Sequence, residues 1–408
     1  MNQLPVAVIH DTGKKRIKGN HPWIFSNELL RKPDAAAGEW VEIQDRSGHY
    51  LATGYYNPHT LIAIRILTFQ RTFDPAERIQ NAFRFREKHY RDKIYRLIYS
   101  ESDGLPGLIV DRYEETLVIQ ILTAGMEKLR DQVLSVLQDL IQPKQILLRN
   151  DSPYRKLEGL EQQVDWYHGS PVTVEWIEVD GLKFLIDYEQ GQKTGFFLDQ
   201  RENRKRLLSY GPADSLLDVF SYTGAWAMYG AAAGIPKILA VDSSQEALQK
   251  AEQNAAANGY RITTIVADAP EFLRELSGSA ERYDRIVLDP PPFCKSKRHL
   301  ASATRAYREI NLRAMKSLSP GGLLFSCSCS QPVTSEIFLE ILRQAAVASG
   351  RRFFLREILF HPPDHPILVG FPESHYLKCA ILQEGSAGFS RHQVPPASAG
   401  TADVPSAT

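Results

Sequence analysis

The sequence predicts an α/β protein with three domains and a tail. Its 408 residues exceed the ~100–200 residues of one typical domain. After residue 191, short apolar runs alternate with helical stretches, which is typical of a parallel, doubly wound sheet. We expect a small β-barrel at residues 1–72, an α+β middle domain at 73–180, a doubly wound domain at 181–384 and a tail at 385–408.

Composition excludes several classes of protein. Hydrophobic residues make up 43% of the chain and charged residues 24%, which are ordinary values for a globular protein. Lys plus Arg and Asp plus Glu each number 48, so a nucleic-acid footprint must be local. No run approaches the ~20 apolar residues of a membrane span, and charges interrupt the N-terminus where a secretory signal is apolar. We expect a cytoplasmic protein without a membrane partner.

The four cysteines are Cys294, Cys327, Cys329 and Cys379. Three of them lie within a short stretch of the chain, which is not the pattern of a disulfide framework. Their spacing also lacks a second CxxC or a His pair, which a structural zinc site requires. We therefore expect no bound metal.

The first seventy residues alternate β-rich runs with Gly, Asn and Pro turns, as in a small β-barrel. The runs are at residues 4–10, 38–45, 49–57 and 61–69. Between the first two lies a basic loop with Lys14, Lys15 and Arg16, followed by His21 and Trp23. Cations beside aromatic rings suit contact with RNA phosphates and stacking on bases. The same pattern also fits a solvated charge run before core aromatics.

The middle domain mixes helix and strand. We expect helices at 76–96 and 128–140 and strands at 107–113, 116–122 and 145–149. The last strand is followed by Arg149, Asn150, Asp151 and Arg155, whose spacing demands no chemistry, so we interpret them as structural. The tail is rich in Ala, Ser, Pro and Gly and poor in large apolar residues, which predicts disorder.

The doubly wound domain is the most regular part of the chain. We expect strands at 215–220, 237–242, 262–268, 284–289, 322–328, 353–360 and 376–383, with helices ending near 233 and 258 and helices at 271–276 and 334–349. Ligands of such sheets bind at the carboxyl ends of the strands. The functional residues should therefore stand in the turns that follow these strands.

The turn after the first strand indicates the cofactor. Gly224 is its one glycine, and the G-x-G-x-x-G cradle that a pyrophosphate requires is missing, which favours S-adenosylmethionine over a dinucleotide. The second strand ends in Asp242, which can accept the ribose hydroxyls, with Ser243 beside it. The third ends in Asp268, which can accept the adenine amino group. Each acid could also be a turn or cap residue, but three strand ends in order predict a site.

The fourth strand ends in Asp289, followed by three prolines and Phe293. Prolines fix the backbone and hold the acid in one orientation. This sequence resembles a motif of methyltransferases that act on amino groups or bases, where the acid contacts the target base. The basic run behind it, with Lys295, Lys297 and Arg298, suits RNA phosphates. The alternative is a rigid turn beside a solvated charge cluster.

Cys327 and Cys329 fall on one side of the next strand because side chains alternate along it. The C5 atom of cytosine is too poor a nucleophile to take a methyl group directly. A thiolate that adds at C6 activates C5, after which a base removes the C5 proton and the thiol leaves. The alternative is a small buried hydrophobic residue.

These motifs resemble the bacterial class I methyltransferases of 23S ribosomal RNA that make 5-methylcytosine and carry an N-terminal PUA domain. The resemblance covers residues 1–382 and is most specific at 191–203, 217–227, 289–293 and 364–378 and in the SCS before Thr334 and Ser335. It implies a Rossmann-like catalytic domain behind a PUA-like barrel. It also implies RNA contact by the segment KGNHPWIFSNEL.

The resemblance also assigns roles to individual residues. It implies that Lys193, Thr194 and Gly195 wrap the cofactor, that Asp199 and Arg201 organise this segment, that Phe220, Tyr222 and Gly224 contact S-adenosylmethionine, and that Cys329 is the nucleophile. Relatives usually carry another residue at Cys327, and we interpret Cys294 as coincidental.

The predicted function is methyl transfer from S-adenosylmethionine to C5 of a cytosine in large-subunit ribosomal RNA, most specifically 23S RNA. Cys329 would be the nucleophile, and Asp289 would hold the base. Two alternatives stay open: an RNA guanine N-methyltransferase, in which the cysteine is a bystander, and an RNA-binding or assembly factor that has lost activity. The sequence leaves the oligomeric state open, a homodimer included.

Overall fold

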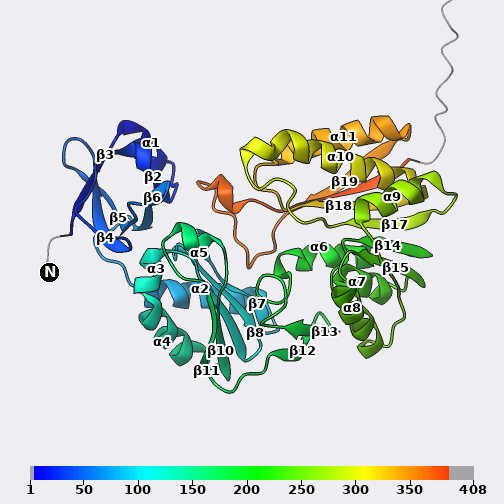
Figure 1. The fold of residues 1–408 in the computed structure, drawn as a ribbon, viewed down its shortest axis with the longest axis horizontal. Coiled ribbons are helices and arrows are strands. Elements are labelled where there is room, and N and C mark those ends of the chain that lie inside the picture. The colour runs from blue at the N-terminus through cyan, green and yellow to red at the C-terminus, as the bar shows by residue number, and fades with distance from the viewer. Residues whose placement is uncertain (1–3, 386–408) are drawn as a thin grey trace, which may run out of the picture.

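A computed structural model describes residues 4–385, so the tail predicted to be disordered lies almost wholly outside the described residues. Three larger sheets follow one another along the chain, with a two-stranded hairpin between the second and the third. Figure 1 shows them from the N-terminal domain in blue to the C-terminal domain in green, yellow and red. Within the described residues, no helix is both long and apolar enough to span a membrane.

The N-terminal sheet has the strand order β2-β6-β5-β4-β1-β3. Its elements are β1 (Val6–Ile9), α1 (Asp11–Lys18), β2 (Trp23–Phe25), η1 (Ser26–Glu28), β3 (Leu29–Arg31), β4 (Glu39–Gln44), β5 (Tyr50–Tyr56) and β6 (Ile62–Thr68). The prediction of a basic loop is wrong, because this run forms helix α1. Asp11 stands in its first turn and basic residues in its last, which suits the helix dipole.

The middle sheet has the order β11-β10-β9-β8-β7. Its elements are α2 (Pro75–His89), β7 (Ile94–Tyr99), η2 (Ser100–Asp103), β8 (Leu108–Tyr113), β9 (Thr116–Ile121), α3 (Ala124–Lys128), α4 (Arg130–Ile141), β10 (Gln145–Asn150), α5 (Tyr154–Leu157) and β11 (Gln163–His168). The helix predicted at 76–96 ends earlier, at His89. Strand β7 begins at Ile94, within the predicted helix, because its Ile, Tyr and Leu side chains favour a buried strand, which pairs with β8.

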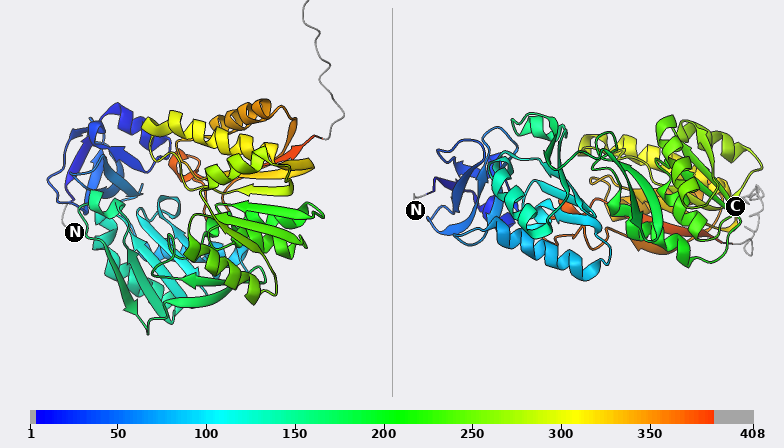
Figure 2. Two further views of the ribbon diagram at one scale, coloured as in Figure 1. Left: turned by 45° about the vertical axis from the view of Figure 1, so that its right-hand side comes forward. Right: turned by 90° about the horizontal axis from the view of Figure 1, so that it is seen from below.

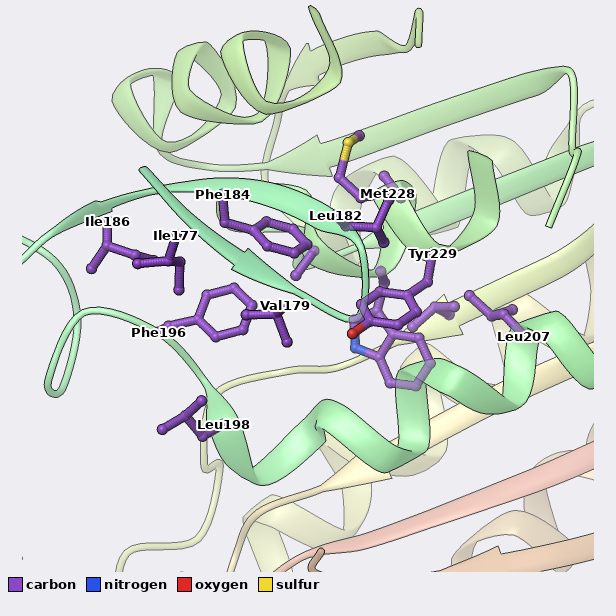
Figure 3. Close-up of a cluster of buried hydrophobic side chains, with 14 of the residues drawn as sticks. Ile177, Val179, Leu182, Phe184, Ile186, Phe196, Leu198, Leu207, Met228 and Tyr229 are labelled. Carbon is purple, nitrogen blue, oxygen red and sulfur yellow. The ribbon is translucent and has the colours of Figure 1, made fainter. Parts of the chain in front are cut away.

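A hairpin joins the middle sheet to the C-terminal sheet. It consists of β12 (Val174–Val179) and β13 (Leu182–Asp187), and its turn at Asp180 and Gly181 has positive φ at both positions. The domain boundary predicted between 180 and 181 therefore cuts a single structural unit. Figure 3 shows the apolar side chains of this hairpin packed against Phe196, Met228 and Tyr229.

The C-terminal sheet has seven strands in the order β16-β15-β14-β17-β18-β20-β19, in which β20 runs in the opposite direction to the other six. The strands are β14 (Ser215–Val219), β15 (Lys237–Asp242), β16 (Thr263–Val266), β17 (Tyr283–Leu288), β18 (Leu318–Ser328), β19 (Phe353–Leu359) and β20 (Lys378–Glu384). The order reverses between β14 and β17, where ligands of such sheets bind. The predicted doubly wound sheet is confirmed.

Helices cover both faces of this sheet (Figure 1). They are η3 (Leu198–Gln200), α6 (Arg201–Lys205), η4 (Arg206–Ser209), α7 (Ala225–Ala232), α8 (Gln245–Ala257), α9 (Ala269–Gly278), η5 (Lys297–His299), α10 (Leu300–Lys316) and α11 (Ser335–Ser349). Side chains of each strand alternate between the faces, so that Leu216 enters one apolar core and Leu217 the other.

Residues 360–377, between β19 and β20, form what we call the connecting segment; it contains η6 (Pro372–Ser374). Figures 1 and 2 show this segment, in orange to red, extending from the C-terminal sheet toward the N-terminal domain. Asp364 accepts the backbone N–H of Arg96 at 2.8 Å, and the rings of Phe371 and Trp23 are 4.6 Å apart. The segment therefore ties all three domains together.

Gly370 provides a test of this docking. A Cβ atom at this position would lie 2.3 Å from the carbonyl oxygen of Gly19, a backbone atom that cannot rotate away. Gly370→Ala should lower the free energy of unfolding by about 1–3 kcal/mol, measured by urea denaturation. Gly278→Ala is the control, because a Cβ there meets nothing within 4 Å. Equal stability of both variants would contradict the close approach.

Candidate active site

A cavity of about 1200 Å³ opens at the carboxyl ends of the strands, between the middle and C-terminal sheets. The predicted cofactor and catalytic residues that line it are Lys193, Phe220, Tyr222, Asp242, Ser243, Asp268, Asp289 and Cys329. Arg149 and Asp151 also line the cavity. The guanidinium of Arg149 donates to the carbonyls of Tyr188 and Gly191, at 3.0 and 2.7 Å, which agrees with its predicted structural role.

Two strand-end acids are held by backbone N–H groups of the turns at this edge of the sheet. Asp242 accepts the N–H groups of Tyr222 and Ser244, both at 2.9 Å, and Asp268 caps α9 by accepting the N–H of Glu271 at 3.0 Å. Each carboxylate oxygen has two lone pairs, so both acids can still accept ligand hydroxyl or amino groups. The functional and capping interpretations of these acids are therefore compatible.

The turn after β14 has unusual backbone geometry. Phe220 and Tyr222 have φ of 64° and 52° without being glycine, which costs free energy and is common at functional sites. Gly224 lies outside the cavity lining. Its φ is 76°, and a Cβ there would lie 2.8 Å from the Cβ of Ala251 in α8. Gly224 is therefore required for the close packing of this turn on α8, and its contact with the cofactor stays a prediction.

Lys193 alone faces the cavity among the three residues predicted to wrap the cofactor. Its Nζ atom is 2.9 Å from Asp199 and 4.5 Å from the centre of the Phe197 ring. Thr194 is fully buried and donates to Asp111 of the middle sheet. A Cβ at Gly195 would lie 2.6 Å from Ile186. Thr194 and Gly195 therefore hold the segment that contains Lys193 on the side away from the cavity.

Asp289 is half-buried at the switch point of the sheet. Gln200 and Trp226 donate to its two oxygens at 2.7 and 2.9 Å, which fixes the plane of the carboxylate. Burial raises the pKa of Asp289, although these donors and Arg204 oppose the shift. The result is a carboxylate more basic than an exposed one.

Several buried polar atoms around the cavity lack a hydrogen-bond partner in the described residues. They are Nε and Nη1 of Arg204, Oδ1 of Asp199 and Oδ1 of Asp218. Buried polar groups are normally paired, so this cluster fits a ligand end that carries both an anion and a cation. The carboxylate and ammonium of S-adenosylmethionine match it. Neither Arg204 nor Asp218 was predicted from the sequence, although Arg204 directly follows the motif at 191–203 and Asp218 lies within the motif at 217–227.

Cys329 follows directly after β18, and its thiol donates to the carbonyl of Pro290 at 3.6 Å. Burial raises the pKa of this thiol to about 12; Lys193 lowers the pKa, and Asp289 and Asp199 raise it. Among the four cysteines, all within the described residues, Cys329 alone lines the cavity. Cys327 is buried opposite Cys379 in the sheet.

The basic residues among those predicted to bind RNA fall into two groups. Lys15, Lys295, Lys297 and Arg298 are exposed, and Lys295 lines the cavity. Lys14 and Arg16 form ion pairs within the N-terminal domain, with Asp45 at 2.7 Å and Glu28 at 3.1 Å. Their cationic groups are therefore already partly neutralised.

His21 and Trp23 do not present free rings to RNA in this structure. His21 is 6% exposed, and its Nε2 lies 3.2 Å from Glu373 of the connecting segment. The indole of Trp23 donates to Glu101 at 2.8 Å and packs on Phe371. Both rings fill the contact between domains, and RNA contact by these two residues stays a prediction.

Comparison with known proteins defines the class. A family model described as a PUA-like domain matches residues 8–69, and one described as an S-adenosylmethionine-dependent methyltransferase matches residues 146–372. The fold and the cavity are thus those of an S-adenosylmethionine-dependent methyltransferase with an N-terminal PUA-like domain, as predicted.

The relatives specify the family further. The chain is 39% identical over 387 residues to the ribosomal RNA large subunit methyltransferase I of Aeromonas salmonicida, covering 91% of this chain and 97% of that protein. It is 38% identical over 396 residues to that of Klebsiella pneumoniae, covering 93% and 99%. The chain belongs to this family of ribosomal RNA large subunit methyltransferases I.

Solved structures show the same fold. An S-adenosylmethionine-dependent methyltransferase of Streptococcus mutans matches with a TM-score of 0.78 at 17% identity, over 93% of this chain and 99% of that one. A methyltransferase solved with SAH matches with a TM-score of 0.80 at 18% identity, over 94% and 100%. The three-domain arrangement is therefore shared beyond the close relatives.

Asp218 gives a pH-dependent prediction. Burial raises its pKa from 3.8 to about 7 in the folded protein, so the folded state retains a proton that the unfolded chain releases. Stability should therefore fall as the pH rises from about 4 to about 7. In Asp218→Asn the remaining oxygen can still accept from Ser221 and Ala227, as Oδ2 does now.

The free energy of unfolding of Asp218→Asn relative to the wild type should therefore increase by about 1–3 kcal/mol between pH 5 and pH 8. Urea denaturation at each pH measures it, with the exposed Asp214→Asn as control. A difference that stays constant with pH would show that Asp218 does not titrate in this range.

Proposed function

We propose that this protein transfers a methyl group from S-adenosylmethionine to C5 of a cytosine in large-subunit ribosomal RNA. The observation that carries the proposal is the position of Cys329, whose thiol lines the cavity together with Asp289 and the strand-end acids. A cysteine nucleophile is required for C5 of cytosine but not for a ring nitrogen or an amino group. The names of the relatives support ribosomal RNA as the substrate, which also supports action in the cytoplasm.

The residues that line the cavity suit each part of the cofactor. Asp242 would accept the ribose hydroxyls and Asp268 the adenine amino group. Arg204 would bind the carboxylate of the methionine end, with Asp199 or Asp218 as partner of its ammonium. When bound, S-adenosylmethionine supplies an electrophilic methyl group on sulfur. Lys193 lies over Phe197 at the rim of the same cavity and would cover the bound ligand.

Methylation then proceeds through a covalent adduct of the base. The Cys329 thiol loses its proton, and the sulfur forms a bond to C6 of the cytosine, which places the electron pair of the C5–C6 double bond on C5. C5 takes the methyl group. Asp289, whose pKa burial raises, accepts the C5 proton, and that C–H electron pair restores the double bond as the sulfur leaves C6. The proton on Asp289 passes to solvent.

The exposed cations beside the cavity would bind the RNA backbone. Lys295, Lys297 and Arg298 follow the proline turn that holds Asp289, so phosphates bound there would flank the target base. Lys15 is exposed on α1 of the N-terminal domain and would extend the contact. The PUA-like domain is thus proposed as a second RNA-binding surface of the same substrate.

Substitution of Cys329 tests the reaction. Cys329→Ala should reduce methylation of ribosomal RNA from a deletion strain at least ~10³-fold while it leaves S-adenosylmethionine binding intact, because the thiol is not assigned to the cofactor. Incorporation of labelled methyl groups and mass mapping of the modified base measure the outcome. Cys327→Ala is the matched control, since that thiol lies outside the cavity lining. Full methylation by Cys329→Ala would instead favour a guanine N-methyltransferase.

Substitution of Arg204 tests the placement of the cofactor. Arg204→Met should weaken S-adenosylmethionine binding about 10- to 100-fold, because a charge-assisted hydrogen bond contributes ~1.5–3 kcal/mol. Methylthioadenosine lacks the amino-acid end, so its affinity should change little. Calorimetry measures both ligands, and Arg206→Met is the control because Arg206 pairs with Glu357. Equal losses for both ligands would contradict the assignment, and no binding by the wild type would favour an inactive assembly factor.

A further inference from the structure

Lys378, the first residue of β20, is a buried lysine without a carboxylate. Its side chain is 1% exposed, and its Nζ donates to the carbonyls of Ser330 and Tyr376 at 3.0 and 2.8 Å. Within residues 4–385 it forms no ion pair with Asp or Glu at salt-bridge distance. Buried lysines are normally paired, because the charged amine loses its hydration. This residue is therefore suited to a neutral amine.

The hydrogen bonds of Lys378 match the neutral form. A neutral amine has two N–H groups and one lone pair, and two carbonyl oxygens accept from Nζ. The third position on nitrogen is then a lone pair that can take a proton. Burial lowers the pKa of Lys378 to about 8, so this form is available near neutral pH.

The sheet places Lys378 beside the nucleophile. Strands β18 and β20 pair antiparallel with Ser328 opposite Lys378, and Cys329 is the next residue. The Nζ of Lys378 lies 3.0 Å from the carbonyl oxygen of Ser330, the residue that follows Cys329, and a Cys329 thiolate would raise the pKa of the Lys378 amine. Ser330, which accepts from Lys378, is itself fixed, since its hydroxyl accepts the N–H of Cys294 and lies 3.0 Å from the Tyr307 hydroxyl.

The other groups near this pair do not replace Lys378. Lys193, the cation that lowers the pKa of the thiol, is already paired with Asp199 at 2.9 Å. His361 and His375 face Lys378 from the connecting segment, and burial lowers the pKa of both imidazoles, to about 3 for His361. Tyr307 has a pKa raised to about 12 by burial. Asp199 and Asp289 face the thiol but oppose its ionisation.

We propose that Lys378 is the base that takes the proton of the Cys329 thiol as sulfur bonds to C6 of the target base. The proton moves from sulfur to the Nζ lone pair, and the S–H electron pair forms the S–C6 bond. When that bond breaks, its electron pair returns to sulfur, which recovers the proton from the Lys378 ammonium. The amine is thus regenerated, and the C5 proton leaves separately through Asp289. This inference rests on the proposed function.

Lys378→Gln is the decisive variant. The amide retains two N–H groups for the carbonyls of Ser330 and Tyr376 but has no basic lone pair. In single-turnover reactions with RNA, methylation should fall about 10²-fold, while S-adenosylmethionine affinity stays unchanged by calorimetry. RNA with 5-fluorocytosine at the target, which has no C5 proton to lose, should accumulate the covalent adduct more slowly by a similar factor. Lys193→Gln, at the other nearby cation, should slow adduct formation less.

Two further measurements keep the inference open to refutation. In the wild type, the single-turnover rate should rise with pH and level off near pH 8, because only the neutral amine accepts a proton; a flat profile from pH 6 to pH 9 would overturn the proposal even if Lys378→Gln does not fold. Alkylation of Cys329 by iodoacetamide, followed by mass spectrometry, needs no RNA and should also slow in Lys378→Gln.

Different results would overturn the role of Lys378 and the proposed function. Wild-type rates of alkylation and adduct formation in Lys378→Gln, with Cys329→Ala inactive, would overturn the role of Lys378 and leave the proposed function standing. Slower alkylation in Lys378→Gln together with full methylation by Cys329→Ala would establish the proton pair but refute the covalent reaction.

Discussion

The carboxylate of Asp199 joins the parts of the active site. It is buried, yet the Lys193 ammonium beside it and the Tyr376 hydroxyl, at 2.9 and 2.6 Å, hold its pKa well below its usual range. Lys193 belongs to the segment that borders the cofactor cavity and Tyr376 to the connecting segment. One ionised group therefore links the cavity, the Rossmann-like sheet and the segment that docks on the N-terminal domain. Loss of its charge would release both partners at once.

The same cavity carries more buried charge than its own hydrogen bonds satisfy. Asp218 and Arg204 keep unpartnered polar atoms, and burial shifts the pKa of both groups toward their neutral forms. Unpartnered buried charges destabilise the folded protein relative to an apolar cavity lining. A bound ligand that completes the hydrogen bonds would offset this cost. The strained turn at Phe220 and Tyr222 also costs free energy, and such strain at a ligand site persists because the surrounding structure enforces it.

The sequence predicted the parts of the site that local rules determine. Alternation of strands and helices predicted a parallel sheet, and from it followed that Asp242, Asp268 and Asp289 would stand at one edge. Contacts between residues distant in the sequence were missed. Trp23 packs on Phe371 and Gly224 on Ala251, neither of which spacing reveals. The basic run of α1 was predicted to be a loop, because Gly13 and the many charged residues obscure the helical pattern in a helix of only 8 residues.

The surroundings of Cys329, the proposed nucleophile, keep its thiol unreactive until the target base binds. Burial raises the pKa of the Cys329 thiol to about 12 and lowers that of Lys378 to about 8, so near neutral pH the thiol stays protonated while only part of the Lys378 population is the neutral amine. A free thiolate in a cavity open to solvent would be alkylated or oxidised. A protonated thiol avoids that risk, because transfer of its proton to the proposed base Lys378 becomes favourable only as sulfur shares its electron pair with C6. The reactivity of the thiol is thereby coupled to binding of the target base. The pairing of β18 with β20, which places Lys378 near Cys329, also fixes the C-terminal end of the connecting segment.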